Sequence, residues 1–160
     1  MQKRKLVFDY NLFDSIEELS SVQQKLMHSA IAARKDAYAP YSKFHVGAAV
    51  LLKNGKTVIG SNQENASYPA GVCAERVAIL YAGAKYPGVA IVAIAITATS
   101  KNHKVDAPVT SCGICRQSMA EYEQKQKTPI EILMMGEIGQ VIQCNSVLDL
   151  IPFAFDSAFL

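Results

Sequence analysis

Residues 45–61, HVGAAVLLKNGKTVIGS, are the most informative stretch about the architecture of this chain. Small and β-branched residues fill positions 45–52, and positions 57–61 have the same character. Asn54-Gly55 lies between them and is a strong hairpin signal, because such a pair accepts the left-handed backbone of a tight turn. The sequence therefore predicts an antiparallel hairpin as the first unit of a sheet.

Further elements are expected before this hairpin. Residues 5–8 have a strand-like apolar pattern, and Ser20 or Ser21 can cap a helix that Pro40 ends. The apolar residues of that helix recur every three or four positions and form one stripe: Val22, Leu26, Ala30, Ala33 and Ala37.

After the hairpin, helices and strands alternate. Helix formers fill residues 73–84, where Val77, Leu80 and Tyr81 make an apolar face, and residues 112–126. Strands are predicted over 91–97, 130–134 and a short segment through Val141 and Ile142. Strands separated by helices pair in parallel, whereas the hairpin is antiparallel. We therefore expect an α/β fold, a three-layer α/β/α sandwich with a mixed central sheet.

The composition favours one domain. The chain has 160 residues, and 50% of them are hydrophobic, which suffices for one proper core. We expect a single domain over residues 1–160, with a core over about 20–145. The last residues, 147–160, are too apolar for a solvated tail, so we expect both terminal segments in contacts between subunits.

The charge balance disfavours several partners. Lys and Arg total 16 against 14 Asp and Glu, without the basic excess of a phosphate-backbone binder, so we expect no nucleic acid partner. No stretch approaches the roughly 20 apolar residues of a membrane span, and we expect no membrane partner. Asp9, Asn11 and Asp14 interrupt the apolar N-terminal run, which is too polar for a signal peptide. We therefore expect a cytoplasmic protein.

Three cysteines have the spacing of a catalytic metal site. Cys112 and Cys115 stand three residues apart at a helix start, so their sulfurs point to the same side and can bind one ion. Cys73 opens the other helix and supplies a third thiolate. Three protein ligands leave the fourth tetrahedral position of zinc open to water, as catalytic zinc sites require.

Nearby residues complete this site. Three thiolates outweigh the charge of a divalent ion, but two helix N-termini offset part of that excess, and Arg76 or Arg116 can donate hydrogen bonds to the sulfurs. Arg76 is the first choice. Glu75, two residues after Cys73, is placed to take a proton from a water without binding the metal itself.

The same cysteines and histidines are also compatible with other roles. A Cys-x-x-Cys pair alone is more often a redox pair or half of a structural zinc site, and the Cys-Ala-Glu segment is what favours catalysis. Cys144 is expected to be a small core residue rather than a fourth ligand. His28, His45 and His103 are expected to be surface, strand and loop residues.

Four segments in fixed order extend this pattern: residues 38–49 (YAPYSKFHVGAA), 60–66 (GSNQENA), 73–76 (CAER) and 112–117 (CGICRQ). In these segments the chain resembles the small homotetrameric cytidine deaminases, members of a wider class of zinc deaminases in which a Glu acts beside the metal ligands. The resemblance implies one zinc ion per subunit. It also implies hydrolysis of cytidine and deoxycytidine to uridine and deoxyuridine, a step of pyrimidine salvage that releases ammonia.

The resemblance also assigns the substrate contacts. Phe44 resembles the aromatic residue against the pyrimidine ring, and Asn62 and Glu64 resemble the pair that binds the ribose 3′-hydroxyl. We expect these two on one strand, where residues two apart share a face and can reach one sugar. Ala74 offers its backbone to the base, and Phe155 resembles the aromatic residue lent to a neighbouring subunit. In this scheme a zinc-activated water attacks C4, and Glu75 carries the proton of the water to N3 and then helps to protonate the departing amine.

The chain departs from the family pattern at two points. Three rival functions also fit parts of the sequence. Ser111 stands where the family commonly has proline, and the chain begins about a dozen residues earlier than compact members. The rivals are a deaminase of another cytosine compound, a non-catalytic zinc module closed by Cys144, and a polynucleotide editor. Asn62 and Glu64 argue against the first, Glu75 against the second, and the lack of interleaved aromatic and basic residues against the third.

Overall fold

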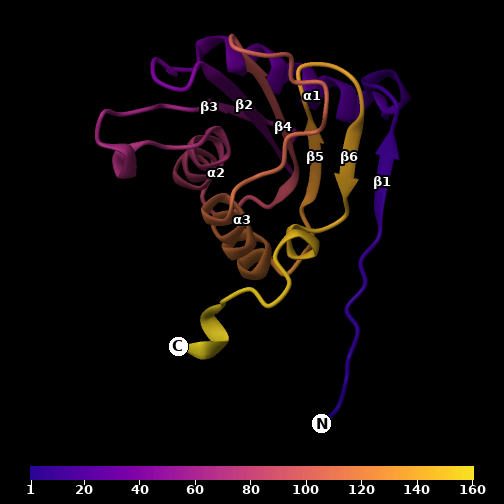
Figure 1. The fold of residues 1–160 in the computed structure, drawn as a ribbon. Coiled ribbons are helices and arrows are strands. Elements are labelled where there is room, and N and C mark those ends of the chain that lie inside the picture. The colour runs from indigo at the N-terminus through magenta and orange to yellow at the C-terminus, as the bar shows by residue number, and fades with distance from the viewer.

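A six-stranded mixed sheet forms the middle of the computed structural model, which describes residues 1–160 (Figure 1). The strand order is β1-β6-β5-β4-β2-β3. Only β4 and β5 pair in parallel, and every other neighbouring pair is antiparallel. The strands are β1 (Tyr10–Phe13), β2 (Phe44–Leu52), β3 (Thr57–Ser61), β4 (Ile91–Ser100), β5 (Glu131–Met135) and β6 (Val141–Cys144).

Three helices cover the two faces of the sheet. They are α1 (Ser21–Ala33), α2 (Ala74–Lys85) and α3 (Gly113–Gln126). Successive side chains of a strand point to opposite faces, and β2 shows the division: Ala48 and Val50 belong to the core shared with α2 and α3, whereas Ala49 belongs to the core under α1. The expected three-layer α/β/α sandwich with a mixed sheet is confirmed.

Short 3-10 helices fill the connections. They are η1 (Ile16–Glu18), η2 (Arg34–Asp36), η3 (Tyr68–Ala70), η4 (Val147–Leu150) and η5 (Ser157–Phe159). No helix is both long and apolar enough to cross a bilayer.

Two sequence predictions about the elements were wrong in detail. The N-terminal strand is Tyr10–Phe13 and not residues 5–8, because only the later residues lie opposite β6. In α2 the expected apolar face is largely exposed: Leu80 is 48% exposed and Tyr81 51%. The helix instead packs through small residues and one isoleucine, because it lies close against the sheet: Ala74, Ala78, Ile79 and Ala82.

Val22, expected on the buried stripe of α1, is also exposed, and that stripe begins at Leu26. Val22 lies in the first turn of α1, at the end of the helix, where it borders an open cavity instead of the core.

Gly60 sets the approach of α2 to the sheet. A Cβ atom at this position of β3 would lie 2.6 Å from both the Ala74 oxygen and the Ala78 nitrogen. Such separations are shorter than van der Waals contact, so only glycine allows the first turn of α2 to lie against β3.

The C-terminal segment, residues 147–160, is anchored along α3. Arg116 donates a hydrogen bond to the Leu150 oxygen at 2.8 Å, and Gln117 donates one to the Phe155 oxygen at 2.9 Å. At the other end of α3, the buried Glu123 carboxylate accepts the Val147 N–H at 2.9 Å. One helix therefore holds both the start and the later part of this segment.

Candidate metal centre and active site

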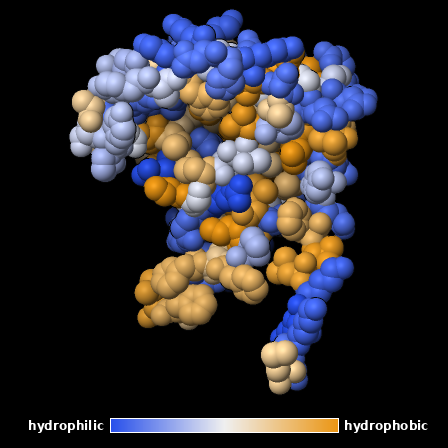
Figure 2. Space-filling model, in the orientation of Figure 1, coloured by the Kyte–Doolittle hydropathy of each residue, from blue (hydrophilic) through white to orange (hydrophobic).

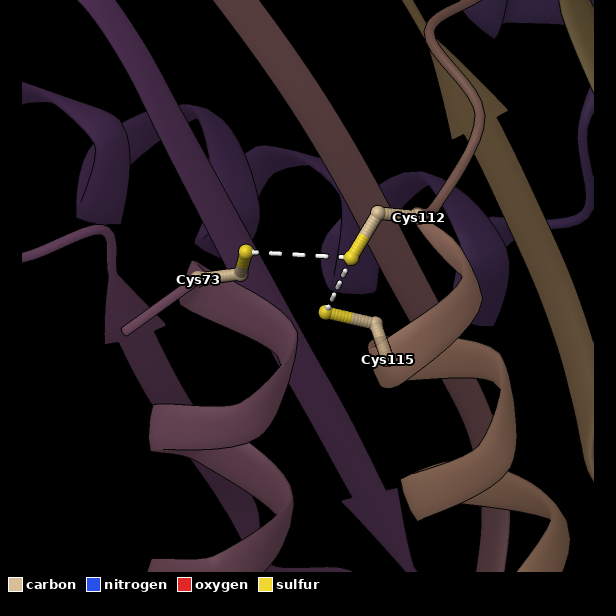
Figure 3. A group of neighbouring side chains, drawn as sticks. All are labelled: Cys73, Cys112 and Cys115. Atoms are coloured by element: carbon tan, nitrogen blue, oxygen red, sulfur yellow. Dashed lines mark hydrogen bonds between the residues drawn. The ribbon is translucent and has the colours of Figure 1, made fainter. Parts of the chain in front are cut away.

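The three predicted cysteine ligands meet where α2 and α3 begin (Figure 3). Cys73 and Cys112 are the N-cap residues of the two helices, and Cys115 lies in the first turn of α3. The positive end of a helix dipole favours the thiolate form of a cysteine. Two such ends converge on this cluster, which suits it to hold a cation through thiolate ligands.

The sulfur positions fit one zinc ion. All three sulfur atoms lie within 4.8 Å of one another, with 4.0 Å between Cys73 and Cys112 and 3.4 Å between Cys112 and Cys115. Tetrahedral ligands at a zinc–sulfur distance of about 2.3 Å stand about 3.8 Å apart. The cluster thus needs only small side-chain adjustments to close on zinc, and it leaves one tetrahedral position free.

The other candidate ligands lie elsewhere. Cys144 is a buried residue of β6 within the core, as predicted, and is not a member of the cluster. His28 lies on α1, His45 in β2 and His103 in the loop after β4, and none of them joins the three sulfurs.

Hydrogen bonding between the thiols shifts the pKa values of Cys73 and Cys115 in opposite directions. Hydrogen bonding from Cys115 lowers the pKa of Cys73 to about 6, with Arg76 adding a smaller electrostatic contribution. The same bond, together with burial, raises the pKa of Cys115. The cluster therefore already contains one thiol that ionises readily and is ready to act as a ligand.

Glu75 lies in the first turn of α2, two residues after Cys73, and is only 4% exposed. Burial raises the pKa of its carboxyl group, and the neighbouring Cys115 thiol partly opposes that change. No Lys, Arg or His side chain pairs with it. A buried carboxyl group with no cationic partner beside a metal-ligand cluster is suited to exchange protons.

The two candidate arginines differ in their surroundings. Arg76 follows Glu75 and acts electrostatically on Cys73. Arg116 instead donates from Nε to the Ser111 oxygen at 2.9 Å and from a terminal nitrogen to Leu150. Arg116 thereby fixes the loop that leads to Cys112, and Ser111 keeps a buried hydroxyl group without a hydrogen-bond partner.

An open cavity of about 460 Å³ adjoins Cys73. Its other lining residues come from the segments after Pro40 and after β3: Tyr41, Ser42, Asn62, Gln63, Glu64, Asn65, Tyr68, Gly71 and Val72. This volume falls in the range of small-molecule sites, and the lining mixes aromatic rings with amide and carboxylate groups. The cavity is therefore suited to a polar molecule that carries a ring.

Asn62 and Glu64 both line this cavity, but they lie just beyond the end of β3 and not on the strand. The Asn62 amide accepts the Val46 N–H at 2.8 Å and donates to the Phe44 oxygen at 2.9 Å. One Glu64 carboxylate oxygen accepts the Tyr41 N–H at 2.8 Å. Both side chains are thus held in place by the backbone, which leaves their remaining donor and acceptor positions in fixed directions.

Glu64 also binds the turn beside it. The same oxygen accepts the Ser42 N–H at 3.2 Å. Hydrogen bonding from the Ser42 side chain, and to a lesser extent from the Tyr41 and Ser42 N–H groups, lowers the pKa of Glu64. Glu64 is therefore a stable anion next to the cavity.

The other three predicted substrate contacts, Phe44, Ala74 and Phe155, differ in their exposure and surroundings. Phe44 is the first residue of β2 and is half-buried, and Ala74 is a buried residue whose N–H, in the first turn of α2, has no partner within the helix. Phe155 does not line the cavity of its own subunit. It is 56% exposed and stacks on Phe159 with 5.5 Å between ring centroids.

Sequence reasoning gave no role to Tyr41 and Tyr68, although both line the cavity. Their rings stand 6.1 Å apart at 56°, an arrangement typical of an aromatic pair. Tyr41 lies within the quoted segment 38–49, and Tyr68 precedes Pro69 between two other quoted segments, but neither stretch has a periodicity that shows which way its ring points.

Comparisons with known proteins agree with this geometry. Residues 20–129 match the family model described as the cytidine and deoxycytidylate deaminase zinc-binding region. The cytidine deaminase of Halalkalibacterium halodurans is 42% identical over 134 residues, which cover 83% of this chain and 93% of that protein. The cytidine deaminase of Mycobacterium tuberculosis is 39% identical over 130 residues, or 81% of this chain and 86% of that protein.

Solved structures show the same likeness. The crystal structure of a cytidine deaminase from Burkholderia pseudomallei superposes with a TM-score of 0.72 at 40% identity, and the match covers 86% of this chain and 100% of that one. The structure from Mycobacterium tuberculosis gives a TM-score of 0.62 at 30% identity over 82% of this chain and 95% of that one.

Proposed function

This chain belongs to the cytidine deaminase family, and from that premise we propose that it hydrolyses cytidine and deoxycytidine to uridine and deoxyuridine, with release of ammonia. The observation that carries the proposal is the buried Glu75 beside a three-cysteine zinc site, of which one ligand, Cys73, lines a cavity of about 460 Å³. The reaction belongs to pyrimidine salvage. Zinc, when bound by Cys73, Cys112 and Cys115, lowers the pKa of water and thereby supplies the nucleophile.

Glu75 carries the protons of this reaction. Its carboxylate takes a proton from the attacking water and delivers it to N3 of the base while C4 becomes tetrahedral. It then takes the proton of the new hydroxyl group at C4 and gives it to the amine. The C4–N4 bond breaks, ammonia leaves, and the carboxylate returns to its starting form.

Two residues that line the cavity, Asn62 and Glu64, and two that do not, Phe44 and Ala74, hold the nucleoside in this proposal. Phe44 presents a flat apolar wall to the pyrimidine ring, and the Ala74 backbone contacts the base. Asn62 and Glu64 bind the ribose 3′-hydroxyl, and their anchoring to the backbone supports this role, because it limits the freedom lost on binding. Arg76 moderates the negative charge of the thiolates, supported by its electrostatic effect on Cys73.

The proposal extends to the oligomeric state of the protein and to its compartment in the cell. We propose that the protein is a homo-oligomer, specifically a tetramer, in which Phe155 reaches the cavity of a neighbouring subunit. Its exposed ring and the other exposed apolar side chains of residues 147–160 support this assignment. Residues 1–160 act as one catalytic domain. Three thiolates persist in a reducing compartment, which supports the cytoplasm.

One assay tests this function directly. Cytidine, deoxycytidine, cytosine base and adenosine are offered to the zinc-loaded protein, and the change in ultraviolet absorbance is followed. We expect turnover of the first two alone, because the cavity binds a sugar and the site requires an amine at C4. Turnover of the free base with equal efficiency would contradict the roles of Asn62 and Glu64, and turnover of none of the four would contradict the proposed activity.

A further inference from the structure

The N-terminal arm, residues 1–9, continues β1 beyond the body of the protein (Figure 1). No backbone group of the arm forms a hydrogen bond. β1 pairs with β6 on one side only and is the outermost strand of the sheet. An extended segment with free N–H and C=O groups, in line with an open sheet edge, is a template for pairing with another strand.

The arm and β1 also share an uncovered apolar stripe. Leu12 and Tyr10 lie opposite Ile142 and Cys144, which belong to the core on the α2 and α3 face. No helix lies over these two residues, and they remain 51% and 56% exposed. Phe8 and Leu6 continue the alternation along the arm at 43% and 58%. Figure 2 shows orange, hydrophobic residues where the arm joins the body, above the blue, hydrophilic part of the arm.

Charges are segregated at the two ends of this stripe. Lys3, Arg4 and Lys5 precede it. On its other side stand three exposed acidic residues, Asp14, Glu17 and Glu18. Two copies paired in parallel would bring like charges together, which is destabilising, whereas antiparallel copies bring each basic end to an acidic end.

We propose that the arm and β1 form a self-recognition edge, on which a second copy of this chain pairs antiparallel through residues 3–14. The contact is isologous, so each copy supplies the same surface, and one two-fold axis joins the two sheets. Pairing satisfies the backbone groups that face the partner and brings the two apolar stripes side by side on one face of the joined sheet. This edge lies outside residues 20–129, the part matched by the family model, and the proposal does not rest on the proposed activity.

Hydrogen exchange and sedimentation test this pairing on the full-length, zinc-loaded protein. We expect the amides of residues 6–9 that face the partner strand to exchange at least about tenfold more slowly than in a free peptide, because pairing protects them. Val7→Pro removes one N–H from the arm without touching the body. It should abolish this protection and halve the mass of the assembly, while the matched Val7→Thr, which retains the N–H, should change neither.

Two outcomes of that experiment would overturn the proposal. One is exchange of the arm amides of the unaltered protein at the free-peptide rate. The other is equal mass of the assembly for Val7→Pro and Val7→Thr. Binding of the arm to phosphatidylglycerol vesicles, without association in their absence, would assign the basic and apolar residues to a membrane instead.

Charge reversal tests the antiparallel arrangement. One variant carries Lys3→Glu, Arg4→Glu and Lys5→Glu, and the other carries Asp14→Lys and Glu17→Lys. Each variant alone repels its own copies and should have half the mass of the unaltered assembly. An equimolar mixture should restore the full mass, because each acidic end then meets a basic end, and failure of the mixture to associate would contradict antiparallel pairing.

Discussion

Glu75 and Cys73 stand two residues apart at the start of α2, yet they meet opposite requirements. Cys73 must lose a proton to bind a cation, and hydrogen bonding lowers its pKa to about 6. In the proposed reaction Glu75 exchanges protons, and burial raises its pKa. A single helical turn therefore places an easily ionised ligand beside a carboxyl group that does not remain permanently charged.

The role of Glu75 is tested by Glu75→Gln, which preserves shape but cannot accept a proton at neutral pH. We expect turnover of cytidine to fall by roughly 10² to 10⁴, the usual contribution of a general acid–base group, while zinc content stays unchanged. Glu121→Gln, which alters an exposed carboxylate of α3, serves as the matched control and should keep full activity. Turnover of Glu75→Gln above about a tenth of the normal value would exclude the proton-transfer role, and loss of zinc would make Glu75 a ligand.

The ligand set is tested by metal analysis of single Cys→Ser variants. Cys112→Ser should lose most of its zinc, because a serine hydroxyl replaces one of three thiolates. Cys144→Ser should keep about one zinc per chain and lower only the free energy of unfolding, by about 1–3 kcal/mol, since it buries a hydroxyl group in the core. The assignment is wrong if Cys144→Ser strips the metal and Cys73→Ser does not.

At the scale of elements, the site depends on how closely two helices approach the sheet. α2 brings Cys73 and Glu75, and α3 brings Cys112 and Cys115. The sulfurs of the two helices are 4.0 Å apart between Cys73 and Cys112, so a shift of either helix by an ångström opens the cluster.

Gly60→Ala tests this dependence. The added methyl group would lie 2.6 Å from the Ala74 oxygen, so α2 must move away from β3. We expect the free energy of unfolding to fall by about 1–3 kcal/mol and zinc to be lost more readily to a chelator. Gly113→Ala is the matched control beside the same site, because a Cβ there meets no atom within 4 Å. Equal chelator sensitivity of the two variants would refute the link between Gly60 and the metal site.

The elements also show what can be predicted from sequence. The hairpin followed from Asn54-Gly55, and the cysteine cluster followed from spacing, because both signals are local. The buried face of α2 did not follow. Its larger apolar residues, Leu80 and Tyr81, point away from the sheet, since the close approach at Gly60 admits only small side chains.

Partners that are distant in sequence explain the other differences between the sequence predictions and the structure. β1 begins at Tyr10 because Cys144, distant in sequence, ends the strand that pairs with it. Asn62 and Glu64 were expected on a strand, but their hydrogen bonds to Val46 and Tyr41 come from the preceding segment of the chain, which no local pattern discloses.

At the scale of the molecule, large apolar side chains are exposed on α2 and on the C-terminal segment as well as on the N-terminal arm. Leu80 and Tyr81 lie on α2, and Phe153, Phe155 and Phe159 lie in the C-terminal segment. Exposed apolar patches of this kind mark interaction sites. Together with the arm, they are candidate surfaces for the contacts between copies that we propose.

The shared-site role of Phe155 is tested by Phe155→Ala. If the ring contacts substrate in a neighbouring subunit, the KM for cytidine should rise several-fold with zinc content unchanged. Phe153→Ala is the matched control, since Phe153 is 96% exposed and lies two residues earlier. Sedimentation should show a homo-oligomer for both variants. A fully active monomer, or an unchanged KM for Phe155→Ala, would remove Phe155 from the site.

The anchoring of the C-terminal segment to α3 makes that segment a reporter of metal loading. Arg116, which holds the Leu150 oxygen, adjoins Cys115, and Glu123 holds the Val147 N–H at the other end of the same helix. We expect removal of zinc to loosen the first turn of α3 and with it these anchors, because the metal ties Cys112 and Cys115 to α2. A protease that cuts after aromatic residues should therefore cleave at Phe153 and Phe155 faster in chelator-treated protein than in loaded protein, so that digestion rates measure zinc occupancy without any substrate.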